Sequence, residues 1–232
     1  MIIKTLLVLL FQVFFCKYND PFYIKQAKLR VIMSLVTIDT VETVLSELKE
    51  YASEVDLDFV RQSVRAISSC AVRFEIIAEV AVQLLLELIG SQINYVVQEA
   101  IIAMKDIIRC YPNRFEHSVP VLCDALSTLD QPDAKAALIW MIGEYAPRID
   151  NVNDLMEGFA DSFMDEADTV QLQLITSAVK SFLKQKDFGS QNMAQHLLRV
   201  ASNSENPDVR DRAFIYWRLL SSNTYSIEKV II

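Results

Sequence analysis

Six stripes of apolar residues, each a series of positions on one face of a predicted helix, recur at nearly regular intervals along this chain. Their first residues are Ile24, Val60, Val96, Ala134, Val170 and Val209. Successive stripes begin 36 to 39 residues apart. An α-helix returns to the same face after four, seven and eleven residues, so these offsets test each stripe. Fifteen of the eighteen tested positions are apolar, against roughly nine for random placement. A period of this length predicts an all-α chain, built as an α-solenoid of helix pairs.

The three exceptions are Lys28 in the first copy and Ser177 and Ser181 in the fifth. A second apolar helix follows each of the first five stripes, and proline with a carboxylate marks several helix starts, as at Pro132 and Pro207. Proline in a first turn loses no hydrogen bond, and a carboxylate there meets the positive end of the helix dipole. Pro120 falls inside a predicted second helix and is expected to bend it.

The pattern divides the chain into an atypical N-terminal helical segment, residues 1–19, and a repeat array, residues 20–232. One positive charge, Lys4, precedes a short apolar run that resembles a signal-peptide core. No small-residue cleavage site follows it, and the run is shorter than the roughly 20 apolar residues that span a bilayer. The two interpretations are a signal and the end of a helix from a truncated preceding repeat; the second is favoured.

Charge and cysteine usage narrow the functional classes. The formal net charge of −8 disfavours a nucleic-acid-binding surface and a polybasic membrane patch, because both need a basic stripe. The four cysteines have no paired short spacing, and no Asn-x-Ser/Thr acceptor occurs. Both observations favour a reducing, cytoplasmic setting.

The sequence offers no convincing reactive centre. Its two histidines are His117 and His196, and the spacing of Cys110, His117 and Cys123 matches no short zinc-ligand pair. An acidic group resembles a calcium loop but lacks its glycine and its terminal bidentate glutamate; it comprises Asp161, Asp165, Glu166 and Asp168. We therefore assign no catalytic, cofactor-binding or metal-binding residue, expect no cofactor, and predict that the protein is not an enzyme.

Five strings run through the chain in a fixed order: VFFCKYNDP (13–21), LKEYASEVDLDFVR (48–61), NYVVQEA (94–100), IWMIGEYA (139–146) and RDRAFIYWRLL (210–220). They are similar to segments of the trunk of β-adaptin, the large β subunit of clathrin adaptor complexes. Residues 1–12 depart from the family, and Ser68 and Ser69 stand where a glycine and a basic residue are more usual.

The resemblance implies a trunk of HEAT/armadillo-like repeats that acts as a structural scaffold in vesicle-mediated intracellular protein transport, including endocytosis. It implies a second large subunit, a medium subunit and a small subunit as partners, with clathrin contacted only through regions beyond residue 232. It also implies a cytoplasmic protein, peripheral on coated vesicles, the trans-Golgi network, endosomes or plasma-membrane coated pits, and attached to the membrane through the complex.

The alternatives are another helical-repeat scaffold, either a coatomer large subunit or a karyopherin-like cargo-binding module. A karyopherin-like module predicts Asn and Trp at matching positions of successive repeats. Tryptophan occurs in only two of the six copies, as Trp140 and Trp217.

Overall fold

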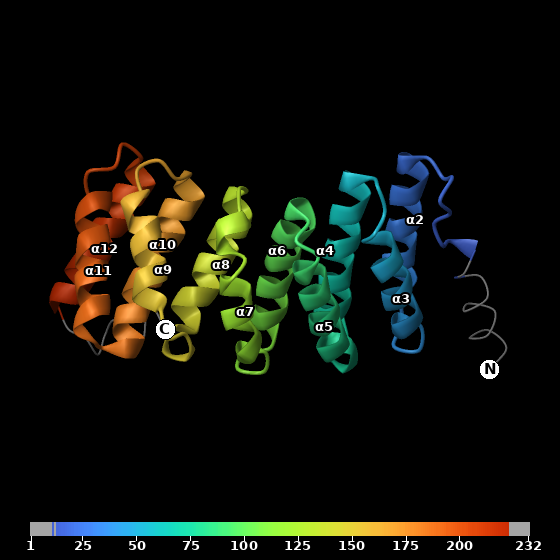
Figure 1. Ribbon diagram of the computed structural model, residues 1–232, viewed down its shortest axis with the longest axis horizontal. Coiled ribbons are helices and arrows are strands. Elements are labelled where there is room, and N and C mark those ends of the chain that lie inside the picture. The colour runs from blue at the N-terminus through green and yellow to red at the C-terminus, as the bar shows by residue number, and fades with distance from the viewer. Residues whose placement is uncertain (1–10, 12, 223–232) are drawn as a thin grey trace. The chain divides into compact units, whose positions relative to one another are not determined.

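The computed structural model describes residue 11 and residues 13–222. The predicted signal-like or truncated-repeat features of residues 1–10 and 12 lie outside the described residues. Eleven α-helices and four short 3-10 helices make up the described part of the chain, which contains no strand (Figure 1). This confirms the predicted all-α fold of helix pairs.

The chain divides into two compact units, residues 1–114 and 115–232. The helices of unit 1 are α2 (Phe22–Leu35), α3 (Val41–Tyr51), α4 (Leu57–Arg73), α5 (Ala78–Gly90) and α6 (Asn94–Cys110), with 3-10 helix η1 (Glu75–Ile77) before α5. In this unit α4 lies between α2 and α6, while α3 and α5 pack against them as a second layer (Figure 1).

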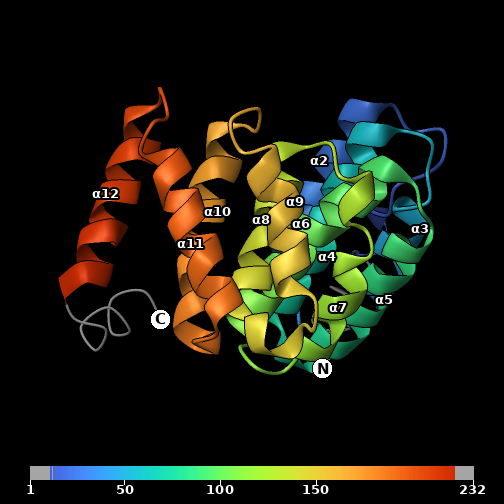
Figure 2. The same ribbon diagram turned by 60° about the vertical axis from the view of Figure 1, so that its left-hand side comes forward.

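Unit 2 repeats this arrangement with one shortened element. Its helices are α7 (Val119–Cys123), α8 (Pro132–Glu144), α9 (Val152–Asp161), α10 (Asp168–Gln185), α11 (Phe188–Ala201) and α12 (Pro207–Ser222), with 3-10 helices η2 (Glu116–Ser118), η3 (Leu126–Thr128) and η4 (Ala146–Arg148). Figure 2 shows α10, α11 and α12 side by side, and α10 also packs along α8.

Local chemistry explains the helix ends. The Asp56 carboxylate caps α4 by accepting hydrogen bonds from the backbone N–H groups of Asp58 and Phe59, at 3.1 and 3.2 Å. Pro132 and Pro207 are the first residues of α8 and α12, as their positions in the sequence predicted.

The expectation that Pro120 bends a helix was wrong. Pro120 is the second residue of α7, where its missing N–H costs no helical hydrogen bond. The second helix of this pair is instead interrupted after Cys123 and continues, after a turn, as η3.

Small residues allow α8 and α10, and likewise α4 and α6, to approach closely. Each of these is the first helix of a helix pair. A Cβ atom built on Gly143 of α8 would lie 2.6 Å from the Cβ and 2.7 Å from the Cα of Ser177 in α10. The Ser177 hydroxyl donates to the backbone oxygen of Ile139 at 2.8 Å. In unit 1, the Ser68 hydroxyl of α4 donates to the backbone oxygen of Ala103 in α6 at 3.1 Å. These serines are buried and their hydroxyls are satisfied across the helix contact.

Ion pairs join the same neighbouring helices. Glu144, at the end of α8, accepts from Lys180 and Lys184 of α10, at 2.6 and 2.5 Å. The Lys184 ammonium also donates to the backbone oxygen of Glu144 at 2.6 Å, which satisfies a free carbonyl at the end of the helix. Burial acts to raise the pKa of Glu144, but the two lysines outweigh it and hold that pKa below its ordinary value.

We predict that Gly143→Ala lowers the free energy of unfolding by about 1–3 kcal/mol, because the added methyl group meets the Ser177 backbone and forces the helices apart. Gly158→Ala in α9 is the matched control, since a Cβ there meets nothing within 4 Å. The control should stabilise the chain by up to about 1 kcal/mol through helix propensity. Urea unfolding followed by circular dichroism measures both, and equal effects would contradict the close approach.

We predict that Glu144→Gln lowers the free energy of unfolding by about 1–3 kcal/mol at neutral pH, because both lysines lose a charged hydrogen-bond partner. A carboxylate with a lowered pKa stabilises the fold above its unfolded-state pKa and loses that effect as the pH falls through the folded-state pKa. The difference from the wild type should therefore shrink as the pH is lowered below about 4.5.

Thermal melts from pH 7 to pH 3 measure this effect. The control is Glu157→Gln, because Glu157 is exposed on α9. A wild-type advantage over Glu144→Gln that does not change with pH would show that the carboxylate charge is not responsible.

Candidate protein-interaction surfaces

Five of the six positions that open the apolar stripes are buried, namely Val60, Val96, Ala134, Val170 and Val209, whereas Ile24 is half-buried. The stripe that begins at Ile24 predicts a buried face at positions 24, 28, 31 and 35. The structure instead buries the residues one position later, namely Lys25, Leu29 and Ile32 of α2 and then Val36. The use of the six positions as repeat markers, and the boundary at residue 20, stay predictions.

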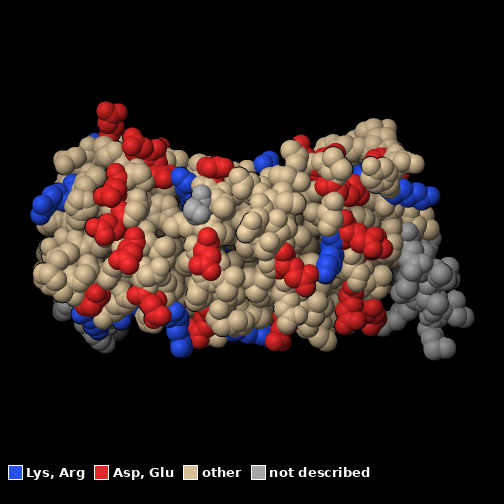
Figure 3. All heavy atoms as spheres, in the orientation of Figure 1, with Lys and Arg blue, Asp and Glu red and all other residues tan. Residues whose placement is uncertain are grey.

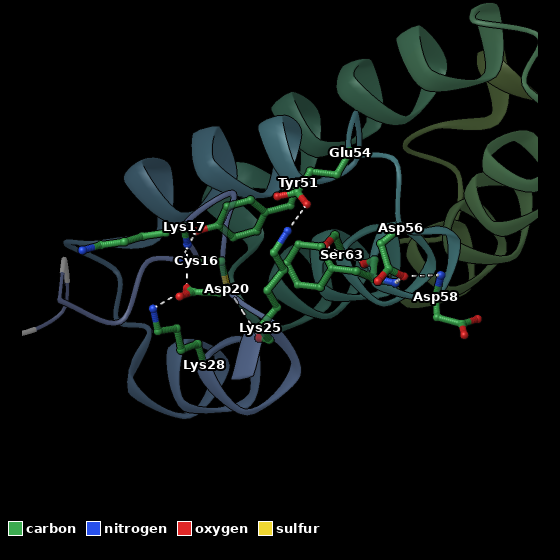
Figure 4. Close-up of polar contacts among 11 residues, drawn as sticks. Cys16, Lys17, Asp20, Lys25, Lys28, Tyr51, Glu54, Asp56, Asp58 and Ser63 are labelled. Carbon is green, nitrogen blue, oxygen red and sulfur yellow. Dashed lines mark hydrogen bonds and ion pairs between the residues drawn. The ribbon is translucent and has the colours of Figure 1, made fainter. Parts of the chain in front are cut away.

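Lys25 is buried because a polar cluster receives its ammonium group. The side chain forms an ion pair with Glu54, which follows α3, and its ammonium lies 5.3 Å from the centre of the Phe59 ring (Figure 4). The centre of the Tyr18 ring lies 5.7 Å from the same ammonium. Carboxylate and aromatic faces together stabilise a cation that has left water.

The segment before α2 is fixed by the same cluster. The Tyr51 hydroxyl accepts from the Cys16 backbone N–H at 2.8 Å. The Asp20 carboxylate accepts from the Lys17 backbone N–H at 2.8 Å and from Lys28 at 2.6 Å, and the latter contact lowers the pKa of Asp20 (Figure 4). The cluster is thus a structural joint between α2, the preceding segment and the end of α3. The side chains that form it already have partners.

The residues weighed as reactive groups do not assemble. Cys110 is exposed at the end of α6, His117 lies in η2, and Cys123 is buried in α7, where burial raises its pKa to about 11. Burial likewise raises the pKa of Cys70 to about 11. Across residue 11 and residues 13–222, no three His, Cys, Asp or Glu side chains gather where they could hold a metal ion.

Unit 1 has a groove between its two second-layer helices, α3 and α5, with a volume of about 320 Å³. Its floor is apolar and consists of the buried side chains of Leu45, Ile77 and Leu84. Val80 stands on one wall and is 55 % exposed. We call this surface the α3–α5 groove.

The rim of the α3–α5 groove is charged. Lys49 of α3 and Glu87 of α5 form an ion pair at 2.8 Å, and both side chains are more than half exposed. Glu42, in the first turn of α3, is exposed on the same rim, and its carboxylate has no ion-pair partner among the described residues. The groove therefore combines an apolar floor with an unneutralised negative charge.

Unit 2 contains a similar groove between α7 and α9, of about 290 Å³. Val121, 52 % exposed, lies on its α7 side, and the exposed acidic residues Asp124 and Asp150 lie on its rim. Arg148, also on the rim, is paired with Glu116 at 3.0 Å. An exposed valine beside unpaired carboxylates thus recurs in the second layer of each unit.

Among the charged side chains, acidic ones predominate over basic ones on the face of each unit that is visible in Figure 3. Several large apolar side chains are also exposed, among them Ile38, Ile76, Phe188 and Trp217. Among the helices that the structure describes, none has the length and apolar character that crossing a membrane requires.

The apolar pattern of the sequence did not predict the two grooves. Glu42 and Val80 lie on helices whose buried faces the periodicity identified, but the grooves form between helices that begin 37 and 33 residues apart along the chain. Ile38 and Ile76, two exposed isoleucines shortly before α3 and α5, do not line the α3–α5 groove and gave no signal for it.

The sequence of this chain matches a known protein family and several known proteins. The family described as "Adaptin N terminal region" matches residues 3–224. The chain is 52 % identical over 222 residues to the rat AP-1 complex subunit beta-1, covering 95 % of this chain and 23 % of that protein. It is 51 % identical over 223 residues to the Dictyostelium discoideum AP-1 complex subunit beta, covering 95 % of this chain and 24 % of that protein.

A more distant relative is the AP-2 complex subunit beta of Schizosaccharomyces pombe, 39 % identical over 220 residues, which cover 94 % of this chain and 32 % of that protein. The chain thus spans about a quarter of the length of the AP-1 relatives it matches.

The structure aligns, with a TM-score of 0.73, to a chain of "Homology model of the full-length AP-3 complex in an intermediate open conformation". The alignment covers 94 % of this chain and 40 % of that one, and its 20 % identity indicates a shared fold. Since the family match extends over nearly the whole sequence and the matched relatives are β subunits, the chain belongs to the adaptin family and is of the β-adaptin type.

Proposed function

We propose that this chain forms part of the trunk of an adaptor-complex β subunit and acts as a helical scaffold for the other subunits in vesicle-mediated protein transport. The observation that carries the proposal is the 52 % identity over 95 % of the chain to an AP-1 β subunit. The stacked helix pairs support it, because such arrays bind partners along extended surfaces rather than in one deep pocket.

The partners we propose are a second large subunit, a medium subunit and a small subunit. We place the complex on the cytoplasmic face of coated membranes, with membrane association through the assembled complex. The coatomer and karyopherin-like alternatives have no comparable support in the residues or in the relatives.

We propose a structural role and no catalysis. Burial raises the pKa values of Cys16, Cys70 and Cys123 to about 11, which disfavours the reactive thiolate at neutral pH. Lys25 and Glu144, two charged side chains that lie in helix contacts, are committed to ion pairs.

Exposed apolar side chains give the proposal a measurable consequence. Ile76, Phe188 and Phe214 are 73, 76 and 48 % exposed, and exposed apolar surface of this kind marks interaction sites or promotes aggregation. We predict that the tagged 232-residue chain is poorly soluble alone. Co-expression with the second large, medium and small adaptor subunits should raise its soluble yield at least about fivefold.

The same co-expression should give a complex in which at least one of these subunits co-purifies in stoichiometric amount through affinity and gel-filtration steps. An unrelated helical-repeat protein carrying the same tag is the control for non-specific capture. A monodisperse, soluble monomer that captures none of the three subunits would contradict the proposed function.

A further inference from the structure

We propose that the α3–α5 groove binds an amphipathic helix of another adaptor subunit, with an apolar stripe on the floor of the groove and a Lys or Arg beside Glu42. This inference rests on the proposed function, because it identifies where and by what chemistry a partner subunit binds.

The floor supplies the apolar part of the site. Leu45, Ile77 and Leu84 are buried below the groove, and Val80 exposes 55 % of its surface on the wall. Grooves between two neighbouring helices bind a third helix through apolar side chains one and two turns apart. The volume of about 320 Å³ accommodates a few such side chains.

The rim fixes the length of the docked segment. Glu42 and Lys49 both line the groove and are seven residues apart on α3, a separation of two helical turns or about 10 Å. The Lys49–Glu87 ion pair marks the far end of this stretch. A docked helix therefore contacts the groove over about two turns, with apolar residues spaced as i, i+4 and i+7.

Charge complementarity identifies the partner as basic. Lys49 and Glu87 neutralise each other, whereas Glu42 has no ion-pair partner among residues 11 and 13–222. The whole chain carries a net charge of −8. The unneutralised charge at the groove is therefore negative, and a partner helix with a cation at this end is attracted and oriented by it.

The test uses two pairs of variants, each co-expressed with the other adaptor subunits, and the captured subunits are quantified after affinity purification. Val80→Asn removes the apolar wall and is expected to lower capture at least about fivefold. Val55→Asn is its matched control, because Val55 is 84 % exposed between α3 and α4 and does not line the groove.

Glu42→Lys reverses the rim charge and should lower capture by a similar factor, while Thr43→Lys should leave it unchanged. Thr43 is the neighbouring exposed residue of α3, so it receives the same new charge in the same helical turn but outside the groove. Capture by the wild type should fall as NaCl is raised from about 50 to about 300 mM, and Glu42→Lys should lose this dependence.

A photo-crosslinking amino acid at Gln83, which lines the groove and is exposed, identifies the bound segment. We expect it to link to an adaptor subunit within a predicted helix that carries an apolar stripe and a Lys or Arg. A crosslink to an acidic segment, or to none of the subunits, would overturn the inference.

The outcomes separate this inference from the proposed function. If the wild type captures adaptor subunits and Val80→Asn and Glu42→Lys capture them equally well, the groove is not the site and the proposed function stands. If the wild type captures none, the proposed function fails and this inference with it.

If sedimentation shows that the chain alone forms a dimer that Val80→Asn disrupts, the groove binds a second copy and the inference is overturned. Circular dichroism melts confirm that each variant is folded.

Discussion

A pair of helices cannot bury both of its apolar faces by itself, and every other feature of this structure depends on how the neighbouring pairs solve that problem. The answer is close contact between successive first helices, α4 with α6 and α8 with α10. Close contact requires small side chains, and Gly143 against Ser177 is the tightest example. It also requires that polar groups at the contact find partners across it, as the Ser68 and Ser177 hydroxyls do on backbone oxygens.

The same constraint sets the sequence distance between charged partners. A residue on one helix meets a residue on the equivalent helix of the next pair, in the first or the second layer, so its partner lies about one repeat away along the chain. Lys180 and Glu144 are 36 residues apart, Arg65 and Glu99 are 34, and Lys49 and Glu87 are 38. The period visible in the apolar residues is therefore also the spacing of these three ion pairs, because both follow from the stacking of equivalent helices.

The fold could be predicted from the sequence because helical periodicity is local, and burial at five of the six stripe positions agrees with it. The first stripe was displaced by one residue because Lys25 counts as polar in a pattern, although its alkyl chain and its ion pair with Glu54 allow it to be buried. Ser177 interrupted the fifth stripe for a similar reason, since its hydroxyl is satisfied across the helix contact. The grooves could not be predicted at all. Their rims join α3 to α5 and α7 to α9, and only the folded backbone brings those elements together.

Stacking also determines where specificity can reside. The floor of the α3–α5 groove consists of the buried residues Leu45, Ile77 and Leu84, and the buried lining residues of the α7–α9 groove are Cys123 and Ile149. Such buried residues are needed for the core of the helix pairs. The rims are free of that requirement. In the α3–α5 groove Glu42 has no ion-pair partner in the described part of the chain, and Lys49 and Glu87 neutralise each other. In the α7–α9 groove Asp124 and Asp150 have none within the same residues, and Arg148 is paired with Glu116. The two grooves thus present different charge patterns. We therefore expect a helix that binds the proposed α3–α5 site to be selected by the few charged residues at its edges rather than by the apolar area beneath them.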